Sequence, residues 1–155
     1  MKRFIFFIFF NLIIHQAAFS QQQANCVPLT SLPSSNQNYI ISNTIRVTGI
    51  KDASQIAGKN VCEVNQTIQY FDGMGRPLQT VSLKGSPGFN DIVQPIAYDA
   101  FGREVKKYLP YSSSVNNGSY KSDALQKLTA FYSNPPSSVQ NTPYPYAETV
   151  SNPRL

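Results

Sequence analysis

The chain has 155 residues and a formal net charge of +5, with 11 prolines, two cysteines, one histidine and no tryptophan. This length is enough for one modest domain. The single histidine, His15, lies in an N-terminal stretch that we expect to be removed. The mature chain then has no histidine. This excludes a serine–histidine or cysteine–histidine catalytic unit within the chain and any metal site with a histidine ligand. We therefore predict no metal and no cofactor.

The N-terminus has the three parts of a secretory signal. A short basic stretch at Lys2-Arg3 precedes an apolar run over residues 4–14. Small residues, Ala18 and Ser20, stand at the two positions that a signal peptidase reads before the expected cleavage after Ser20. The alternative is an uncleaved membrane anchor, but a spanning helix needs about 20 apolar residues. We expect residues 1–20 to be cleaved, the protein to be exported to the periplasm, cell surface or medium, and no membrane span to remain.

Export changes the interpretation of the cysteines. Cys26 and Cys62 both lie in the mature chain, and an oxidising compartment permits a disulfide between them. Two unpaired thiols are the alternative. Residues 21–38 are rich in glutamine, serine and proline and poor in large apolar side chains, which predicts a disordered linker with order beginning near Tyr39.

Two elements are predicted before the middle of the chain. Residues 39–50 alternate between apolar and polar side chains, which indicates one half-buried β-strand. In residues 52–58, Asp52 occupies a helix N-cap position and Gly58 a terminating position. This pattern is typical of one or two helical turns.

An internal repeat follows. Its copies, 27 residues apart, are Phe71-Asp72-Gly73-Met74-Gly75-Arg76 and Tyr98-Asp99-Ala100-Phe101-Gly102-Arg103. Each copy reads aromatic–Asp–x–x–Gly–Arg between strand-like segments, so we predict two β-hairpins, over residues 64–83 and 92–109. In each turn the Asp would accept backbone hydrogen bonds and the Gly would adopt a positive φ. The Arg would cover the sheet or pair with a carboxylate. The predicted structural turn residues are Asp72, Gly75, Arg76, Asp99, Gly102 and Arg103.

The last predicted element is a helix near residues 122–132, with Ser122 as its N-cap. Its sheet-facing side chains are predicted to be Leu125, Leu128, Phe131 and Tyr132; a partner-binding helix is the alternative. The Pro-Tyr-Pro-Tyr stretch at 143–146 is expected to cover a sheet edge or to dock a partner. The predicted fold is mainly β, an antiparallel sheet of β-hairpins with one or two short helices packed on it. It spans residues 39–150, and a tail follows at 151–155.

The two repeat copies resemble the YD repeats of RHS (rearrangement hotspot) proteins. The second copy matches the motif that names these repeats, and the first is a close variant. Most of the mature chain, about residues 38–150, is similar to a domain of unknown function at the N-terminus of large bacterial RHS-repeat proteins. The similar segments are residues 63–72, 91–99, 107–111 and 131–136.

This resemblance implies a function of the protein. RHS-repeat proteins are long and exported, and their hairpins wind into a hollow β-shell. The chain resembles the N-terminal capping domain of such a protein. Because repeat architectures usually need at least three units and this chain has two, we expect it to be a shortened form of that domain, detached from its body. The implied role is non-enzymatic, structural or partner-binding. The expected partner is a protein or a downstream repeat shell, and we also expect self-association.

A secreted, carboxylate-dependent hydrolase that acts on glycans is the alternative function. Its candidate catalytic residues are Asp72, Asp91, Asp99 and Glu104. An aspartate in a glycine-containing turn is more often a hydrogen-bond cap than an acid or base, and no tryptophan is present to line a sugar cleft. We therefore predict no catalytic residue and no enzyme activity. The basic residues are scattered and not interleaved with aromatic ones, so no nucleic-acid binding is predicted.

Overall fold

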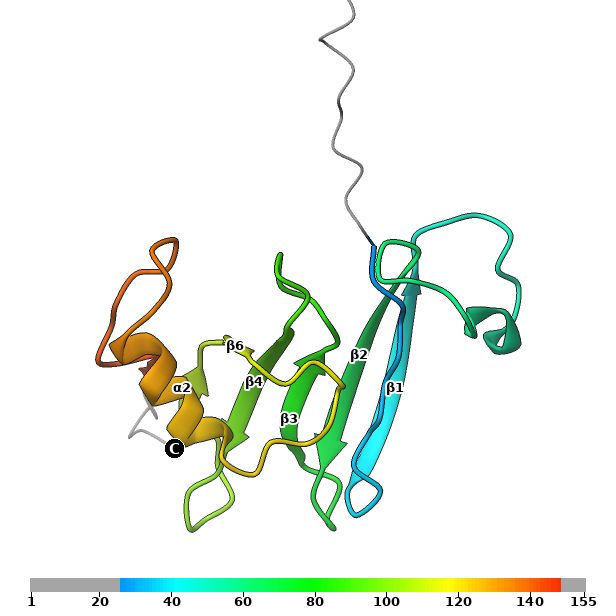
Figure 1. Cartoon of the computed structure of the whole chain (residues 1–155). Coiled ribbons are helices and arrows are strands. Elements are labelled where there is room, and N and C mark those ends of the chain that lie inside the picture. Colours follow the sequence, from blue (N-terminus) through cyan, green and yellow to red (C-terminus); the bar gives the residue numbers. More distant parts are fainter. Residues whose placement is uncertain (1–25, 149–155) are drawn as a thin grey trace, which may run out of the picture.

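The structure is a computed structural model that describes residues 26–148, so the expected signal over residues 1–20 and the tail over 151–155 lie outside the described residues. Its centre is an antiparallel seven-stranded sheet with the order β1-β2-β3-β4-β5-β7, in which β6 also pairs with β4 (Figure 1). The strands are β1 (Asn38–Ile45), β2 (Val64–Phe71), β3 (Pro77–Ser82), β4 (Asp91–Ala97), β5 (Lys106–Tyr108), β6 (Tyr111–Ser113) and β7 (Tyr146–Glu148). The prediction of a mainly β fold with antiparallel hairpins is confirmed.

Two helices accompany the sheet in the described part of the chain. The 3-10 helix η1 (Ala53–Ile56) lies in the connection from β1 to β2, and α2 (Ala124–Ser133) lies across one face of the sheet (Figure 1). Asp52 is the N-cap of η1 and forms a reciprocal capping box with Gln55, as the sequence pattern suggests. Within residues 26–148, no helix combines the length and the apolar content that a bilayer crossing requires.

The core lies on one face of the sheet. Alternate residues of the central strands point into it, and α2 closes it from above; its buried hydrophobic members are Ile68, Tyr70, Val81, Val93, Tyr111, Ala124, Leu128 and Tyr132. Burying a valine, leucine or isoleucine side chain, such as that of Val81, Leu128 or Ile68, supplies about 1.5–3 kcal/mol relative to full exposure. The period of two along β2 and β4 is what gives the sheet one apolar face.

The sheet-facing side of α2 agrees with the prediction at Leu128, Phe131 and Tyr132 and differs from it at Leu125. Leu125 is 40 % exposed, while Ala124, Leu128 and Tyr132 are buried. The N-cap is Asp123 and not Ser122, and its side chain makes no capping hydrogen bond. Asp123 instead forms an ion pair with Lys127 at 3.1 Å, so the first turn is held by a side-chain pair on the helix surface.

The prediction of a disordered linker over residues 21–38 is wrong for residues 26–37, which the structure places along the sheet. Ser34 N donates to the Tyr70 hydroxyl at 3.2 Å, and Leu32 N donates to Asn117 O at 2.7 Å. Tyr120 N in turn donates to Ser34 Oγ at 3.0 Å. These polar contacts hold a segment that has too little apolar surface to bury itself, which is why composition alone did not reveal it.

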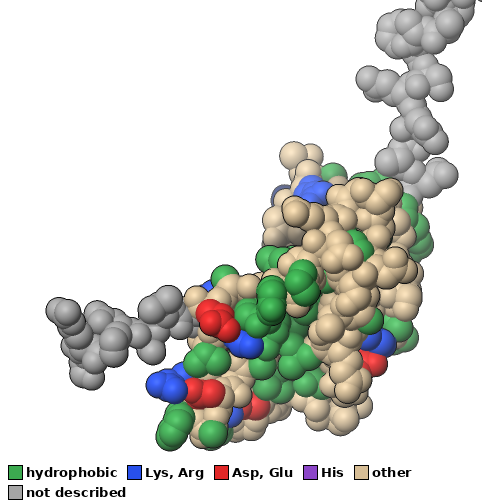
Figure 2. Space-filling view, turned by 90° about the vertical axis from the view of Figure 1, so that its left-hand side faces the viewer, with side chains coloured by type: hydrophobic (Ala, Val, Ile, Leu, Met, Phe, Trp, Pro, Cys, Tyr) green, Lys and Arg blue, Asp and Glu red, His purple; other side chains and the backbone are tan. Residues whose placement is uncertain are grey.

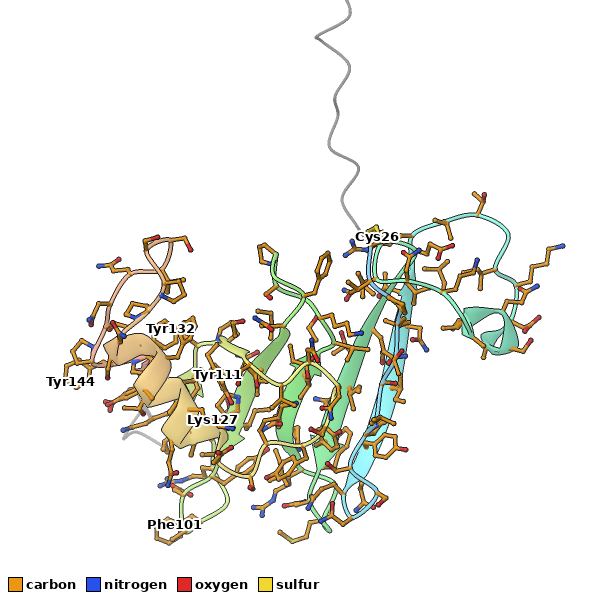
Figure 3. All side chains as sticks on the ribbon, viewed as in Figure 1. Cys26, Phe101, Tyr111, Lys127, Tyr132 and Tyr144 are labelled. Atoms are coloured by element: carbon orange, nitrogen blue, oxygen red, sulfur yellow. A yellow bond between two sulfur atoms is a disulfide. The ribbon has the colours of Figure 1, made fainter. Side chains whose placement is uncertain are left out.

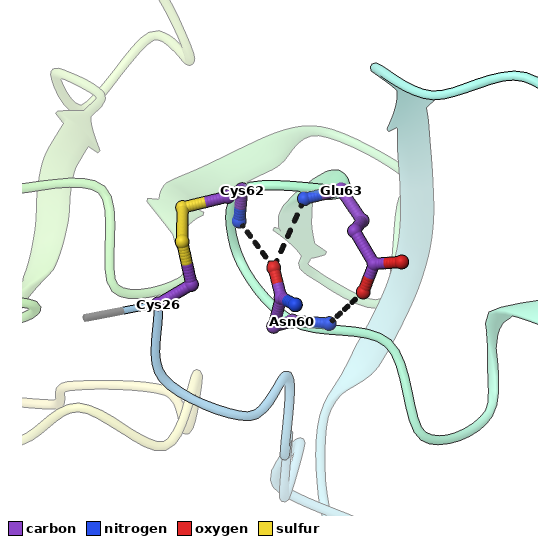
Figure 4. Close-up of a disulfide and its surroundings, with 4 residues drawn as sticks. All are labelled: Cys26, Asn60, Cys62 and Glu63. Atoms are coloured by element: carbon purple, nitrogen blue, oxygen red, sulfur yellow. Dashed lines mark hydrogen bonds between the residues drawn. A yellow bond between two sulfur atoms is a disulfide. The ribbon is translucent and has the colours of Figure 1, made fainter. Parts of the chain in front are cut away.

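A disulfide anchors this segment. Cys26 and Cys62 are bonded, with their Cα atoms 5.8 Å apart (Figure 4). Beside the disulfide, Asn60 Oδ1 accepts hydrogen bonds from the backbone N–H groups of Cys62 and Glu63, and Asn60 N donates to Glu63 Oε2. Asn60 also forms a β-bridge with Pro28. The start of the described chain is thus tied covalently and by backbone pairing to the loop that leads into β2.

The prediction that residues 39–50 form a half-buried strand is also corrected. The strand is shorter, Asn38–Ile45, and all eight of its residues are exposed. β1 is the outermost strand of the sheet and pairs with β2 alone among the described residues. Solvent can reach the side chains of such an outer strand from its open edge. Its apolar and polar residues alternate along the sequence, but all of them remain exposed.

Removing the disulfide should loosen the N-terminal segment. Opening a loop with a sequence separation of 36 is expected to lower the free energy of unfolding by about 3–4 kcal/mol. Denaturant unfolding of a Cys26→Ser/Cys62→Ser double variant, with wild type in reductant as the matched comparison, measures this. Wild type and double variant should converge in reductant; equal stability of oxidised and reduced wild type would contradict the prediction.

Candidate functional site

The first repeat copy forms the turn between β2 and β3. Asp72 Oδ1 accepts hydrogen bonds from Met74 N at 2.9 Å and Arg76 N at 2.8 Å, and Asp72 Oδ2 accepts one from Arg76 Nε at 2.7 Å. The backbone closes the loop through Asp72 N to Arg76 O and Gly75 N to Asp72 O. Gly75 has a φ of 80°, a region that favours glycine. One aspartate therefore organises the whole five-residue turn.

The second copy, after β4, repeats this geometry bond by bond. Asp99 Oδ1 accepts from Phe101 N and Arg103 N, both at 2.9 Å, and Asp99 Oδ2 accepts from Arg103 Nε at 2.8 Å. Asp99 N donates to Arg103 O, Gly102 N donates to Asp99 O, and Gly102 has a φ of 75°. The sequence repeat is thus a repeat of one hydrogen-bonded turn.

These hydrogen bonds keep both aspartates ionised. The pKa of Asp72 is lowered from its usual value of 3.8, first by the backbone N–H of Arg76 and then by the Arg76 side chain, with burial opposing. The pKa of Asp99 is lowered in the same way by Arg103. A carboxyl group with a lowered pKa is a poor proton donor near neutral pH, so neither aspartate is suited to general acid chemistry.

The two turns are linked to each other. The Arg76 guanidinium lies over the Tyr98 ring, 4.7 Å from its centroid, and the Tyr98 hydroxyl donates to Pro77 O at 2.9 Å. The last residue of the first motif therefore contacts the first residue of the second. Gly102 of the second turn also lies close to this arginine. A Cβ added at Gly102 would be 2.9 Å from Arg76 Nη1.

Each turn also carries an exposed apolar residue at its tip. Met74 and Phe101 occupy the same position of the motif and are 74 % and 83 % exposed. Figure 3 shows Phe101 at the end of its loop, pointing away from the sheet. The Arg103 guanidinium lies 5.2 Å from the Phe101 ring centroid. The Arg103 side chain is 63 % exposed, whereas that of Arg76 is 37 % exposed.

Asp91, the third candidate of the hydrolase alternative, has a buried structural position. Its side chain is fully buried and forms an ion pair with Lys121 at 3.0 Å. It also accepts hydrogen bonds from Lys84 N at 3.0 Å and Gly118 N at 2.8 Å. Lys121 Nζ donates further to Ser119 O at 2.7 Å, and burial lowers the pKa of Lys121 despite the opposing effect of Asp91.

Lys121 is the residue that sequence reasoning missed. It stands 30 positions from Asp91 in a stretch with no periodic pattern, so no local signal marks it as a buried partner. Its backbone is held by Gln79, whose amide donates to Lys121 O and accepts from Lys121 N, both at 3.0 Å. The fourth candidate, Glu104, lies on the surface and pairs with Lys107 at 3.2 Å.

The four candidate carboxylates therefore have structural partners, and they belong to different places: two separate turns, the buried sheet face and the surface beside β5. Within the described part of the chain, no group of three or more His, Cys, Asp or Glu residues is arranged to hold a metal ion. The site therefore consists of two equivalent turns at one end of the sheet, in each of which an aspartate is paired with an arginine.

The turn glycines can be tested by substitution. Gly75→Val and Gly102→Val should each lower the free energy of unfolding by about 1–2 kcal/mol, because a side chain is strained at positive φ. Gly73 is the matched control, since its φ is ordinary and nothing lies within 4 Å of an added Cβ. Denaturation curves that showed Gly73→Val as costly as Gly102→Val would refute a specific requirement for glycine at the fourth turn position.

The turn aspartates should make stability depend on pH. The pKa values of Asp72 and Asp99 are lower in the folded than in the unfolded state. Their stabilisation is therefore fully present above the ordinary pKa of 3.8 and is lost as the pH falls through the lowered pKa of the folded state. The stability difference between wild type and an Asp72→Asn/Asp99→Asn variant should therefore shrink from pH 6 to pH 3. Met74→Ser, which alters the same turn without a titrating group, should keep the wild-type profile; parallel profiles for wild type and the double variant would contradict the prediction.

Comparison with known proteins gives a family without an assigned activity. No curated protein and no solved structure matches the chain. A family model described as "Domain of unknown function (DUF6443)" matches residues 43–153, which run from within β1 past the end of the described chain. The match covers well over half of the sequence and includes both turns, so this chain belongs to the DUF6443 family.

Proposed function

We propose that this protein is a non-enzymatic, exported module with a structural or partner-binding role, similar to the N-terminal capping domain of RHS/YD-repeat proteins. The observation that carries the proposal is the contact between the two equivalent turns, in which Arg76 of one motif covers Tyr98 of the next. A motif whose last residue binds the first residue of the following copy is suited to building a sheet from successive hairpins.

The charged groups of the motif support a structural role. In each turn the carboxylate accepts hydrogen bonds from two backbone N–H groups and from the arginine that ends the motif. Each oxygen already accepts at least one of these bonds, so a substrate at either aspartate would compete with bonds that hold the turn. A residue whose hydrogen-bonding capacity is used for folding has little left for catalysis.

The cysteines fit an exported protein. The bond between Cys26 and Cys62 closes the N-terminal segment over the loop that precedes β2, and disulfides persist in oxidising compartments rather than in the cytosol. Together with the signal-like N-terminus, this pairing supports a location in the periplasm, on the cell surface or in the medium.

The proposal is tested against the hydrolase alternative with matched variants. The exported protein is incubated with peptidoglycan, chitin oligosaccharides and other glycans, and the release of reducing ends is measured for wild type, Asp72→Asn, Asp91→Asn, Asp99→Asn and Glu104→Gln. We expect no release above the buffer control. We also expect thermal stability to fall most for Asp91→Asn, because that change leaves the Lys121 charge buried without its partner.

The two classes of protein give opposite patterns. A hydrolase would release reducing ends as wild type and lose this activity in one variant that still melts like wild type. That result would overturn the non-enzymatic proposal and would identify the catalytic carboxylate at the same time.

A further inference from the structure

β1 leaves one side of the sheet open. Among the described residues it pairs only with β2, and it forms the outer end of the strand order. Its large hydrophobic side chains are accessible on both faces; Tyr39, Ile40, Ile41 and Ile45 are between 37 % and 58 % exposed. Exposed apolar side chains and an unpaired strand edge therefore coincide.

The register shows which backbone groups face outward. Arg46, directly after β1, donates its N–H to Glu63 O at 2.8 Å, which continues the pairing of Ile45 with Val64. In an antiparallel pair, residues bonded to the neighbour alternate with residues whose N–H and C=O groups point away. The outward-pointing residues of β1 are therefore Tyr39, Ile41, Asn43 and Ile45.

The sequence of this edge strand lacks the features that usually protect one. Proteins commonly block edge strands with lysine, proline, a bulge or a very short strand. β1 has eight residues, Asn-Tyr-Ile-Ile-Ser-Asn-Thr-Ile, without a charge or a proline, and its register with β2 is unbroken. At the other end of the sheet, β7 has only three residues, and its Glu148 pairs with Lys106 at 3.9 Å.

We propose that β1 pairs with β1 of a second copy of this chain, antiparallel and about a two-fold axis through Ser42, so that two sheets join into one. The outward-pointing residues are arranged symmetrically about Ser42. Tyr39 lies opposite Ile45 of the partner subunit, and Ile41 lies opposite Asn43 of the partner subunit. All outward-pointing residues of both strands are thereby paired.

The side chains favour this occupant. An aromatic ring opposite a β-branched side chain is a favourable cross-strand pair, and the two-fold axis produces it twice, once at each end. Because residues 38–45 carry no charge, pairing of identical strands brings no like charges together. The dimer is independent of the proposed function, which requires neither a second copy nor its absence.

The other exposed apolar groups are less suited to self-pairing. Met74 and Phe101 stand alone at separate turn tips. At the α2 end of the molecule, acidic and basic side chains border the hydrophobic ones (Figure 2). The turn tips present no row of unpaired backbone groups, and the outer strand at that end, β7, has only three residues. β1 combines a row of eight residues with apolar side chains.

A charge-swap experiment at the two-fold axis tests the pairing. Ser42 lies opposite Ser42 of the partner subunit at a position where side chains approach closely, so Ser42→Lys and Ser42→Asp each place like charges together. The oligomeric state of the exported protein is measured by light scattering and sedimentation over a range of concentrations. We expect wild type to form dimers, each single variant to dissociate at several-fold higher concentrations than wild type, and an equimolar mixture of the two variants to form dimers again.

Two controls make the result specific. Thr80→Lys places the same charge on the same face but on interior strand β3, and it should leave the dimer unchanged. Phe101→Ser removes the most exposed aromatic tip and should also leave it unchanged. A monomeric wild type at all concentrations, or a dimer that is disrupted by Phe101→Ser and not by Ser42→Lys, would overturn the proposal.

Discussion

A sheet face that is covered by loops must satisfy the backbone polar groups of those loops. Here α2 covers only part of the inner face, and residues 26–37 and 114–122 cover much of the rest (Figure 1). Asp91 is the centre of this arrangement, because its buried carboxylate binds Gly118 N and Lys121 Nζ of one covering segment and Lys84 N of the loop after β3. The sheet carries buried polar side chains because the irregular segments that cover it have backbone groups that must be hydrogen-bonded.

The same constraint explains two further buried polar groups, the Tyr70 hydroxyl and the Gln79 amide. The Tyr70 hydroxyl donates to Gly118 O at 2.6 Å and accepts from Ser34 N, so it joins both covering segments to β2. Gln79 performs the equivalent task on β3 through its two hydrogen bonds with Lys121. A single buried charge pair is weak evidence for stability. The Asp91–Lys121 pair also hydrogen-bonds backbone groups of the irregular covering segment, and these bonds fix where that segment lies on the sheet.

The parts of the fold that the sequence predicted are those whose causes are local. Each turn is held by hydrogen bonds that reach at most from residue i to i+4, such as those of Asp72 and Asp99, so six consecutive residues contain the whole signal. The cover was not predictable in this way. The contact of Ser34 with Tyr70 spans 36 positions and that of Tyr120 with Ser34 spans 86, and the residues concerned are small or polar without periodicity.

Burial of a strand depends on its neighbours, which explains why β1 was predicted as half-buried and is exposed. Its alternation matches that of β2, but only β2 has a strand on each side. The two turns show the same dependence on neighbours. Arg76 and Arg103 make identical bonds to their own aspartates, yet only Arg76 has the aromatic ring of a following motif beneath it. The more exposed Arg103 instead lies over Phe101 of its own turn. The two motifs thus differ in the exposure of their arginines because of their order in the sheet. The contact between Arg76 and Tyr98 joins two copies, so it cannot be predicted from the sequence of either hexapeptide alone.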